Sequence, residues 1–119
     1  DAFAFANAVM ERRQADALAI LQEQKLRRVE PLMILSEASR VLVSLCAIRT
    51  LADAGHTGEE IAASLHMNPY QVKLYLRVAR AAEPGVLSAA VDACAQADAA
   101  LKRSAAGGYQ LIERLICGL

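Results

Sequence analysis

The sequence has few aromatic residues and no excess of charge of either sign. Aromatic side chains make up 4% of the 119 residues, whereas 55% of the residues are hydrophobic. Valine, isoleucine and threonine nowhere alternate with polar residues for long enough to indicate a strand. Thirteen basic and thirteen acidic residues give a net charge of zero, whereas proteins that bind the phosphate backbone usually have a basic excess. The composition favours one small domain of packed helices and argues against direct DNA binding.

The sequence also lacks the features of a secreted or membrane protein. It has no run of about 18 consecutive apolar residues, and no basic segment followed by an apolar one opens the chain. Its cysteines, Cys46, Cys94 and Cys117, are odd in number and far apart, each within an apolar helical pattern. We therefore expect buried, reduced thiols in a cytoplasmic protein rather than disulfides or a zinc site.

Motifs that carry catalysis or nucleotide binding are missing as well. The sequence has neither a phosphate-binding loop ending in Gly-Lys-Ser or Gly-Lys-Thr nor a glycine-rich dinucleotide turn. Ser36, Ser39 and Ser44 lie in one helical pattern without a histidine that would converge on them. His56 and His66 have no partner at metal-ligand spacing. We expect no active site, no metal or other cofactor, and no binding or hydrolysis of ATP.

Apolar residues at three- and four-residue spacing predict a succession of helices. The expected helices cover about 2–12 and 14–26, a long central stretch from Pro31 to Gly55, a pair within 55–80, a stretch that begins near Pro84, and a last helix after the Gly107-Gly108 turn. The sequence therefore predicts an all-α, single-domain bundle of about five to seven helices over residues 1–119. We expect Leu42 and Leu76 to lie in its seams, where substitution by aspartate would unfold the domain.

The stretch 55–80 predicts a helix-turn-helix-like pair. Thr57 and Glu60 have the spacing of a capping box, in which the hydroxyl and the carboxylate each accept a backbone amide at a helix start. Asn68 is a good N-cap for the second helix, and Pro69 suits its first position because a proline has no N–H to leave unpaired there. Two helices are therefore expected to meet over a short turn.

A helix-turn-helix suggests DNA binding, because its second helix enters the major groove. In the second helix here, apolar residues cover most of the circumference, while Lys73, Arg77 and Arg80 share one narrow stripe. This pattern predicts a helix packed among others, with the basic side chains as a solvated stripe rather than a phosphate-binding one. A helix-turn-helix DNA-binding module of a transcription regulator stays as the alternative function.

Two further features of the last helices could contact a partner. Asp98 precedes Lys102 by four residues, which favours an intrahelical ion pair of roughly 0.2–0.5 kcal/mol over a contact to a neighbouring subunit. Leu115, Ile116 and Leu119 either complete the internal core or form docking surface, and the sequence leaves both open.

Several sequence patterns occur together in these helices. They are EIA-x-x-L and PY-x-VK ending in AR, both within residues 60–80, then D-x-x-LK followed by a leucine-rich end, both within residues 96–119. In this combination the chain resembles the C-terminal region of the bacterial DNA polymerase III delta subunit, a clamp-loader protein. The opening DAFAFANAVMERRQADALAIL is similar to the first two helices of that region. The resemblance spans nearly the whole chain, and the PY-x-VK element is its most specific part.

The resemblance implies a role in assembly. In that family, the C-terminal domain joins those of the other loader subunits in a helical collar, which supports loading of the sliding clamp in DNA replication. Clamp opening and a nucleotide-binding-like fold belong to the N-terminal region. We therefore expect residues 1–119 to be a collar-type fragment without those N-terminal domains. The fragment is expected to be non-catalytic, from a subunit of a DNA-directed DNA polymerase (nucleotidyltransferase) holoenzyme in the cytoplasm.

The expected partners are the gamma/tau-type and delta-prime-type subunits, contacted through their collar domains. Contact with the sliding clamp is expected only through the N-terminal region, DNA binding is expected to be weak and non-specific at most, and no membrane is expected. The candidate interface residues are Lys73, Arg77, Arg80, Asp98, Lys102, Leu115 and Leu119.

Overall fold

The computed structural model describes residues 1–83, 85–103 and 107–118, and this part of the chain is all-helical. It contains seven helices and no strand, which confirms the predicted fold class. The helices are α1 (Ala2–Met10), α2 (Gln14–Leu26), α3 (Pro31–Asp53), α4 (Gly58–Leu65), α5 (Pro69–Ala81), α6 (Val86–Arg103) and α7 (Gly108–Cys117). The predicted helix start at Pro84 and the end of the terminal seam at Leu119 lie outside the described residues.

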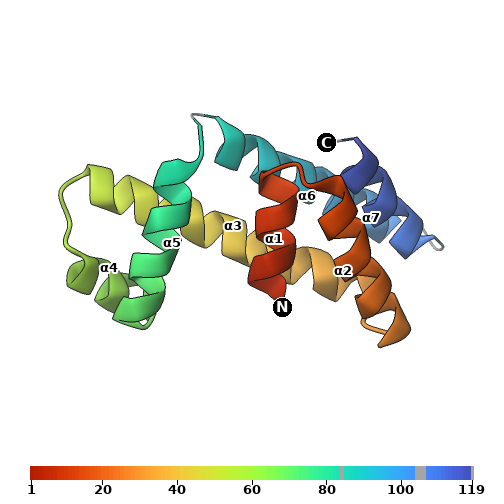
Figure 1. The fold of residues 1–119 in the computed structure, drawn as a ribbon, viewed down its shortest axis with the longest axis horizontal. Helices are drawn as coiled ribbons and strands as arrows, with labels where there is room; N and C mark the ends of the chain where they lie inside the picture. The colour runs from red at the N-terminus through yellow and green to blue at the C-terminus, as the bar shows by residue number, and fades with distance from the viewer. Residues whose placement is uncertain (84, 104–106, 119) are drawn as a thin grey trace.

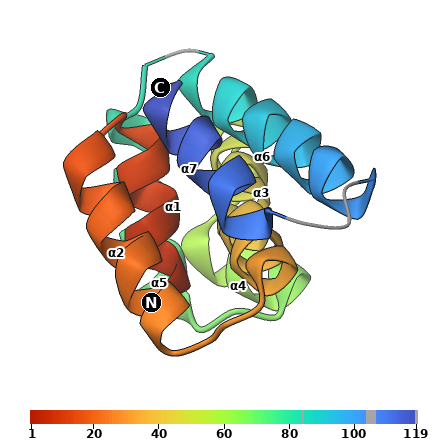
Figure 2. The ribbon, with the colours of Figure 1, turned by 90° about the vertical axis from the view of Figure 1, so that its right-hand side faces the viewer.

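The long helix α3 is the centre of the molecule, which measures 45 × 26 × 25 Å. Figure 1 shows α3 along the long axis, with α4 and α5 at one end and α2 and α7 at the other. Viewed from that second end, α1 and α2 lie on one side of α3, and α6 and α7 lie on another (Figure 2). The fully buried residues of α3 recur every three or four positions, so one face of the helix supplies the core: Leu35, Ala38, Leu42, Leu45 and Ile48.

The composition of α3 follows from this central position. By length and composition alone, α3 is apolar enough to cross a membrane. The sequence criterion of an unbroken apolar run did not identify it, because Glu37, Arg40 and Arg49 interrupt the run. In the structure, the buried apolar side chains of α3 form the core between its neighbouring helices, which accounts for part of the hydropathy, whereas Leu32, Met33 and Val43 are exposed.

The core consists of two clusters of unequal size. The larger cluster joins α1, α2, α6, α7 and the end of α5, through Ala79, to most of α3. The smaller one consists of Ile48 of α3, Ile61 and Ala62 of α4, and Val72 of α5. Tyr75 of α5 packs against both clusters. The helix-turn-helix-like pair therefore has a small core around α4 and the start of α5, while the end of α5 is built into the larger cluster.

Close contacts fix the start of α7. A side-chain Cβ at Gly108 would lie 2.7 Å from Cγ of Pro31 and 3.0 Å from Cδ1 of Leu101, so only glycine lets α7 approach α3 and α6 this closely. Beside it, the hydroxyl of Tyr109 donates a hydrogen bond to the carbonyl of Val29. These contacts hold the last helix against the chain segment that leads into α3.

Two local predictions were wrong. The first helix ends at Met10 rather than at Arg12, because Arg12 has the left-handed backbone conformation (φ 61°) that ends a helix. Of the three cysteines, Cys94 is buried and Cys46 half-buried, but Cys117 is exposed, because it ends α7 on the side away from the core. Apolar neighbours in sequence did not distinguish the inner side of that helix from the outer.

Candidate functional site

The helix-turn-helix-like pair begins with the predicted capping box. The hydroxyl oxygen of Thr57 accepts a hydrogen bond from the backbone N–H of Glu60 at 3.2 Å, and the Glu60 carboxylate accepts one from the N–H of Thr57 at 2.8 Å. The bond from the Thr57 backbone lowers the pKa of the Glu60 carboxyl. The start of α4 is therefore fixed as the sequence predicted.

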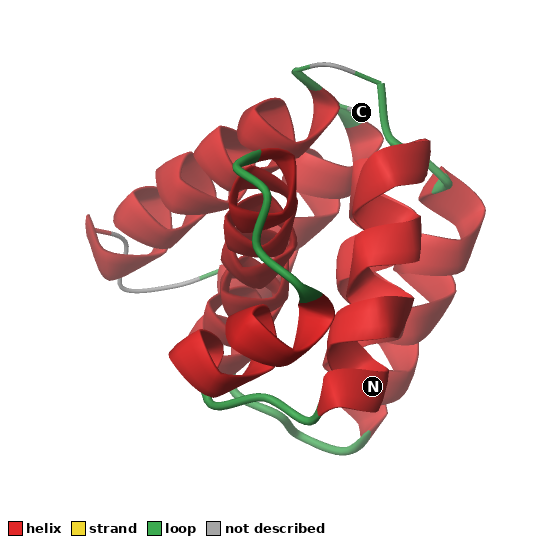
Figure 3. Cartoon of the chain, turned by 90° about the vertical axis from the view of Figure 1, so that its left-hand side faces the viewer, coloured by secondary structure: helices red, strands yellow, loops and turns green. Residues whose placement is uncertain are grey.

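The second helix of the pair also begins as predicted. The side-chain oxygen of Asn68 accepts a hydrogen bond from the N–H of Tyr70 at 2.8 Å, and Pro69 is the first helical residue. His66 ends α4 in the left-handed conformation with φ 55°, so a turn of three residues joins the helices. Figure 3 shows the molecule from the end that this pair forms.

The predicted packing of α5 holds in part: of the six apolar residues expected against other helices, only Leu74 is exposed, but the covered side is narrower than expected. Only Val72 and Ala79 are completely buried, and Leu76 is half-buried. Tyr70 is 77% exposed and Leu74 37% exposed. Helices α3 and α4 pack against α5, and Phe3 of α1 packs on Tyr75, which leaves another side of α5 uncovered. Apolar composition predicted burial, whereas position in the bundle determines how many faces are covered.

The three basic residues of α5 lie on its uncovered side. Lys73, Arg77 and Arg80 are all exposed, and within the described part of the chain none of them forms an ion pair. We call the surface made by these three residues with Tyr70 and Leu74 the α5 outer face. The predicted stripe therefore exists, but it is part of a wider exposed surface that includes an aromatic ring.

The predicted residues of the last two helices lie elsewhere. Lys102 forms an ion pair with Asp98 within α6, with 3.0 Å between Nζ and Oδ2, as the spacing favoured. Leu115 is half-buried against the larger cluster, and Ile116 is fully buried. The end of α6 and α7 lie toward the opposite end of the long axis from α5, so the structure does not join the candidate residues into one site (Figure 1).

Sequence reasoning missed an apolar surface on the central helix. Leu32, Met33 and Val43 are 38%, 53% and 52% exposed, although they belong to the core helix. With the exposed Ser36 and Arg40 they form what we call the α3 outer face. These three residues lie outside the apolar stripe that the helical spacing assigned to the core, and their positions around the helix, opposite the buried residues, could have revealed this face.

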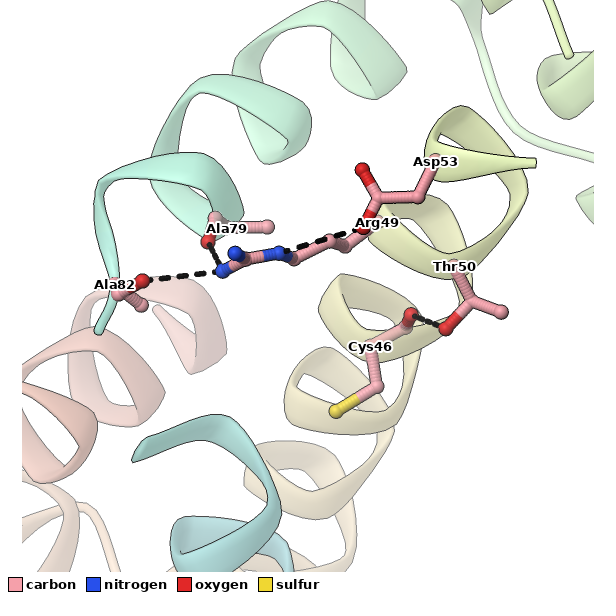
Figure 4. Close-up of polar contacts among 6 residues, drawn as sticks. All are labelled: Cys46, Arg49, Thr50, Asp53, Ala79 and Ala82. Carbon is pink, nitrogen blue, oxygen red and sulfur yellow. Dashed lines mark hydrogen bonds and ion pairs between the residues drawn. The ribbon is translucent and has the colours of Figure 1, made fainter. Parts of the chain in front are cut away.

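A polar joint also escaped the sequence analysis, because its members are far apart in the chain. Nη1 of Arg49 in α3 donates hydrogen bonds to the carbonyls of Ala79 at 2.8 Å and Ala82 at 3.1 Å, as Figure 4 shows. Nε of Arg49 lies 3.9 Å from a carboxylate oxygen of Asp53. The guanidinium thus satisfies carbonyls at the end of α5, where a helix carries partial negative charge. It fixes where α5 ends relative to α3.

An apolar groove lies between the end of α1 and the start of α6. Met10, Arg12 and Val86 line both of its adjoining hollows, which measure about 390 and 450 Å³. The side-chain oxygen of Asn7, at one edge, is buried without a hydrogen-bond partner among the described residues. Within those residues, no group of three or more histidine, cysteine or acidic side chains could hold a metal ion.

These features define a small all-helical domain with a helix-turn-helix-like pair and exposed helix faces. The chain belongs to the family of the DNA polymerase III delta subunit, C-terminal domain, whose model matches residues 1–119. This confirms the resemblance seen in the sequence, and it favours a clamp-loader domain over the alternative of a transcription regulator.

One solved structure supports the fold. The chain is similar to the Bacillus subtilis DNA clamp loader delta protein, with a TM-score of 0.85 at 22% sequence identity. The similarity covers 98% of this chain but 34% of the Bacillus chain, so the domain corresponds to about a third of that protein. Among curated proteins, none matches the chain.

Proposed function

We propose that this domain assembles a DNA polymerase III delta subunit with the other subunits of its clamp loader. The proposal is supported by membership of the delta-subunit family over residues 1–119. The observation that carries it is the α3 outer face, because exposed apolar side chains in a patch are typical of surfaces that bind another protein. Collar-type domains of gamma/tau-type and delta-prime-type subunits are the proposed partners.

The α3 outer face suits a helix-to-helix contact. Leu32 and Val43 are eleven residues apart, which is about three turns, so they lie on the same side of α3 and about 16 Å apart along it. Met33 is next to this stripe, and Ser36 and Arg40 lie between its ends as exposed polar residues. An apolar stripe with polar residues beside it can exclude water at its centre and still set the orientation of the partner.

We propose further that the chain itself is non-catalytic and acts in the cytoplasm, where it serves the polymerase holoenzyme as a structural part. Asp98, Lys102 and Leu115 stay proposed secondary contacts near the other end of the molecule. The ion pair between Asp98 and Lys102 satisfies both charges within α6, so a partner is not needed to neutralise them.

The test is capture of the other loader subunits by the chain carrying Met33→Lys and Val43→Lys. Both side chains are exposed, so we expect an unchanged melting temperature and at least about a ten-fold loss of partner affinity, because two charges would be desolvated in the contact. Leu26→Lys is the matched control, since Leu26 is 84% exposed at the end of α2 and outside the α3 outer face. Full capture by the double variant would reject this face.

A further inference from the structure

The open side of α5 makes nucleic-acid binding by this helix physically reasonable. Its apolar composition predicted a helix packed among others over most of its circumference. Instead, only two of its residues are completely buried, and a surface running from Tyr70 to Arg80 is open. The zero net charge of the chain is a weak objection, because charges more than about 8 Å away are screened at physiological salt. The local charge of the face is what a bound strand would meet.

We propose that the α5 outer face binds single-stranded nucleic acid, with the basic side chains on the phosphates and the ring of Tyr70 stacked on a base. This site is separate from the α3 outer face and goes beyond the proposed function in assembly. It requires only groups that the structure leaves exposed: two guanidinium groups, one ammonium group and one aromatic ring.

The charges of α5 fit a phosphate chain. Within Pro69–Ala81 there are three basic residues and no acidic one, so no carboxylate of the same helix competes for them. Lys73 and Arg80 are seven residues apart, which is about 10 Å along the helix. This edge is long enough to lie beside more than one phosphate of a strand. Arg77 lies between the two.

The exposed aromatic ring of the α5 outer face is the second feature that favours binding of a nucleic acid. Tyr70 lies one turn before Lys73 and is 77% exposed. The other tyrosine of the helix, Tyr75, instead packs on Phe3, with 5.0 Å between the ring centroids. Proteins that bind single strands combine a basic track with aromatic rings on which unpaired bases stack. Tyr70 together with the neighbouring basic residues of α5 provides this combination.

The pair is poorly suited to a duplex. In helix-turn-helix docking, the first helix crosses the DNA backbone while the second enters the major groove. Here the first helix, α4, carries Glu59 and Glu60 and no basic residue, so its carboxylates would approach the phosphates. Among the exposed side chains of α5, Gln71 is the single amide that could read an adenine edge, and the basic residues could contact guanine only if α4 allowed the helix into the groove. A single strand can follow α5 alone and avoid α4.

The test is a titration of the whole chain into a fluorescein-labelled oligothymidylate, followed by anisotropy at several salt concentrations. We expect a dissociation constant within about 1–100 µM at physiological salt, as for other sequence-independent contacts, and tighter binding at low salt. A duplex of the same length should bind more weakly. Tyr70→Ala should weaken binding at least about five-fold, whereas Tyr70→Phe, which keeps the ring, should leave it unchanged.

The basic residues are tested with a charge-matched control. Lys73→Gln with Arg77→Gln should lower the slope of log affinity against log salt by about 1.4, because each phosphate of a single strand that a basic side chain neutralises accounts for about 0.7. Arg40→Gln with Arg103→Gln removes the same charge from exposed positions on α3 and α6 and should have little effect. Equal reductions in the two double variants, or tighter binding of the duplex, would overturn the proposal.

Capture of the loader subunits distinguishes a failure of this inference from a failure of the proposed function. The α5 variants should bind partner subunits normally, and the α3 variants Met33→Lys and Val43→Lys should bind the oligonucleotide at least as well as the parent. If the α5 variants fail to capture partners while their oligonucleotide binding is unchanged, the face contacts protein and the proposal is wrong.

Discussion

Three short polar side chains determine where α1, α4 and α5 begin. The side chains of Asp1, Thr57 and Asn68 each accept a backbone amide of the first turn of the helix that follows. These amides have no partner within the helix, so a local acceptor stabilises the start by about 0.5–2 kcal/mol. Because the interaction joins residues two or three apart, it depends little on the rest of the fold.

The capping box makes one carboxylate a source of pH-dependent stability. The hydrogen bond from Thr57 lowers the pKa of Glu60 below its ordinary 4.5 in the folded state, so the folded protein holds this proton less tightly than the unfolded chain. The stabilisation is therefore complete above pH 4.5 and is lost as the pH falls through the lowered pKa. Glu60→Gln keeps an acceptor for the Thr57 amide but cannot titrate.

Thermal unfolding at pH values from about 3 to 6 checks this. We expect the parent to lose more stability on acidification than Glu60→Gln, with the difference appearing only below pH 4.5. Glu59→Gln is the control, because Glu59 lies in the same first turn but makes no hydrogen bond to Thr57 in the structure. Equal losses of stability with falling pH in the parent and in Glu60→Gln would show that the ionisation of Glu60 does not contribute to the stability of the fold.

At the scale of helices, the position of α5 depends on contacts from α3. The guanidinium of Arg49 donates to two carbonyls at the end of α5, and the ring of Tyr75 packs against α1 through Phe3. The smaller hydrophobic cluster contributes a non-directional attraction. The hydrogen bonds of Arg49 also fix the orientation of α5, since both carbonyl oxygens must lie within reach of one planar guanidinium group.

We expect Arg49→Met to lower the free energy of unfolding by about 1–3 kcal/mol, because hydrogen bonds to a charged donor are lost while the aliphatic part of the side chain is kept. Urea unfolding followed by circular dichroism measures the change. Arg40→Met is the control on the same helix: Arg40 is exposed on the α3 outer face, and its loss should change stability by less than about 0.5 kcal/mol. Equal effects would mean that the joint does not stabilise the fold.

At the scale of the molecule, the larger cluster forms a main body and the smaller one an end unit of α4 and the start of α5, with Ala79 joining α5 to the main body. Leu42 is completely buried in the larger cluster, whereas Leu76 is half-buried at the edge of the smaller one. The helical patterns assigned both leucines the same role, because each lies among apolar neighbours. The structure separates them, since a charge at Leu42 has no route to water and a charge at Leu76 does.

We therefore expect Leu42→Asp to prevent cooperative folding, because an unpaired carboxyl group, charged or neutral, costs several kcal/mol to bury and small domains have a stability of about 5–15 kcal/mol. Leu76→Asp should leave the main body folded and loosen only α4 and α5. Amide hydrogen exchange distinguishes the outcomes: faster exchange confined to residues 58–81 is expected for Leu76→Asp. Global loss of protection in that variant would show that the end unit and the main body fold as one.

The local structure of this protein follows from its sequence without knowledge of the packing. Capping residues, proline and glycine act over a few neighbouring residues, so the bounds of α2, the start of α3, the capping box and the turn before α5 were all predictable. The ion pair between Asp98 and Lys102 was predictable for the same reason, because spacing of four residues on a helix brings the two side chains together. Family membership could also be recognised at this level, since its motifs are short runs within single helices.

Which helix faces are covered depends instead on the packing of the whole molecule. An apolar residue is buried when another helix lies over it, and the helix that covers it can come from any distance along the chain. For this reason Leu74, Met33 and Val43 are exposed although their helices looked like core, and Arg49 meets carbonyls 30 and 33 residues away. Helical spacing places Leu32, Met33 and Val43 on one side of α3, but only the packing of the other helices decides that this side and the α5 outer face stay uncovered.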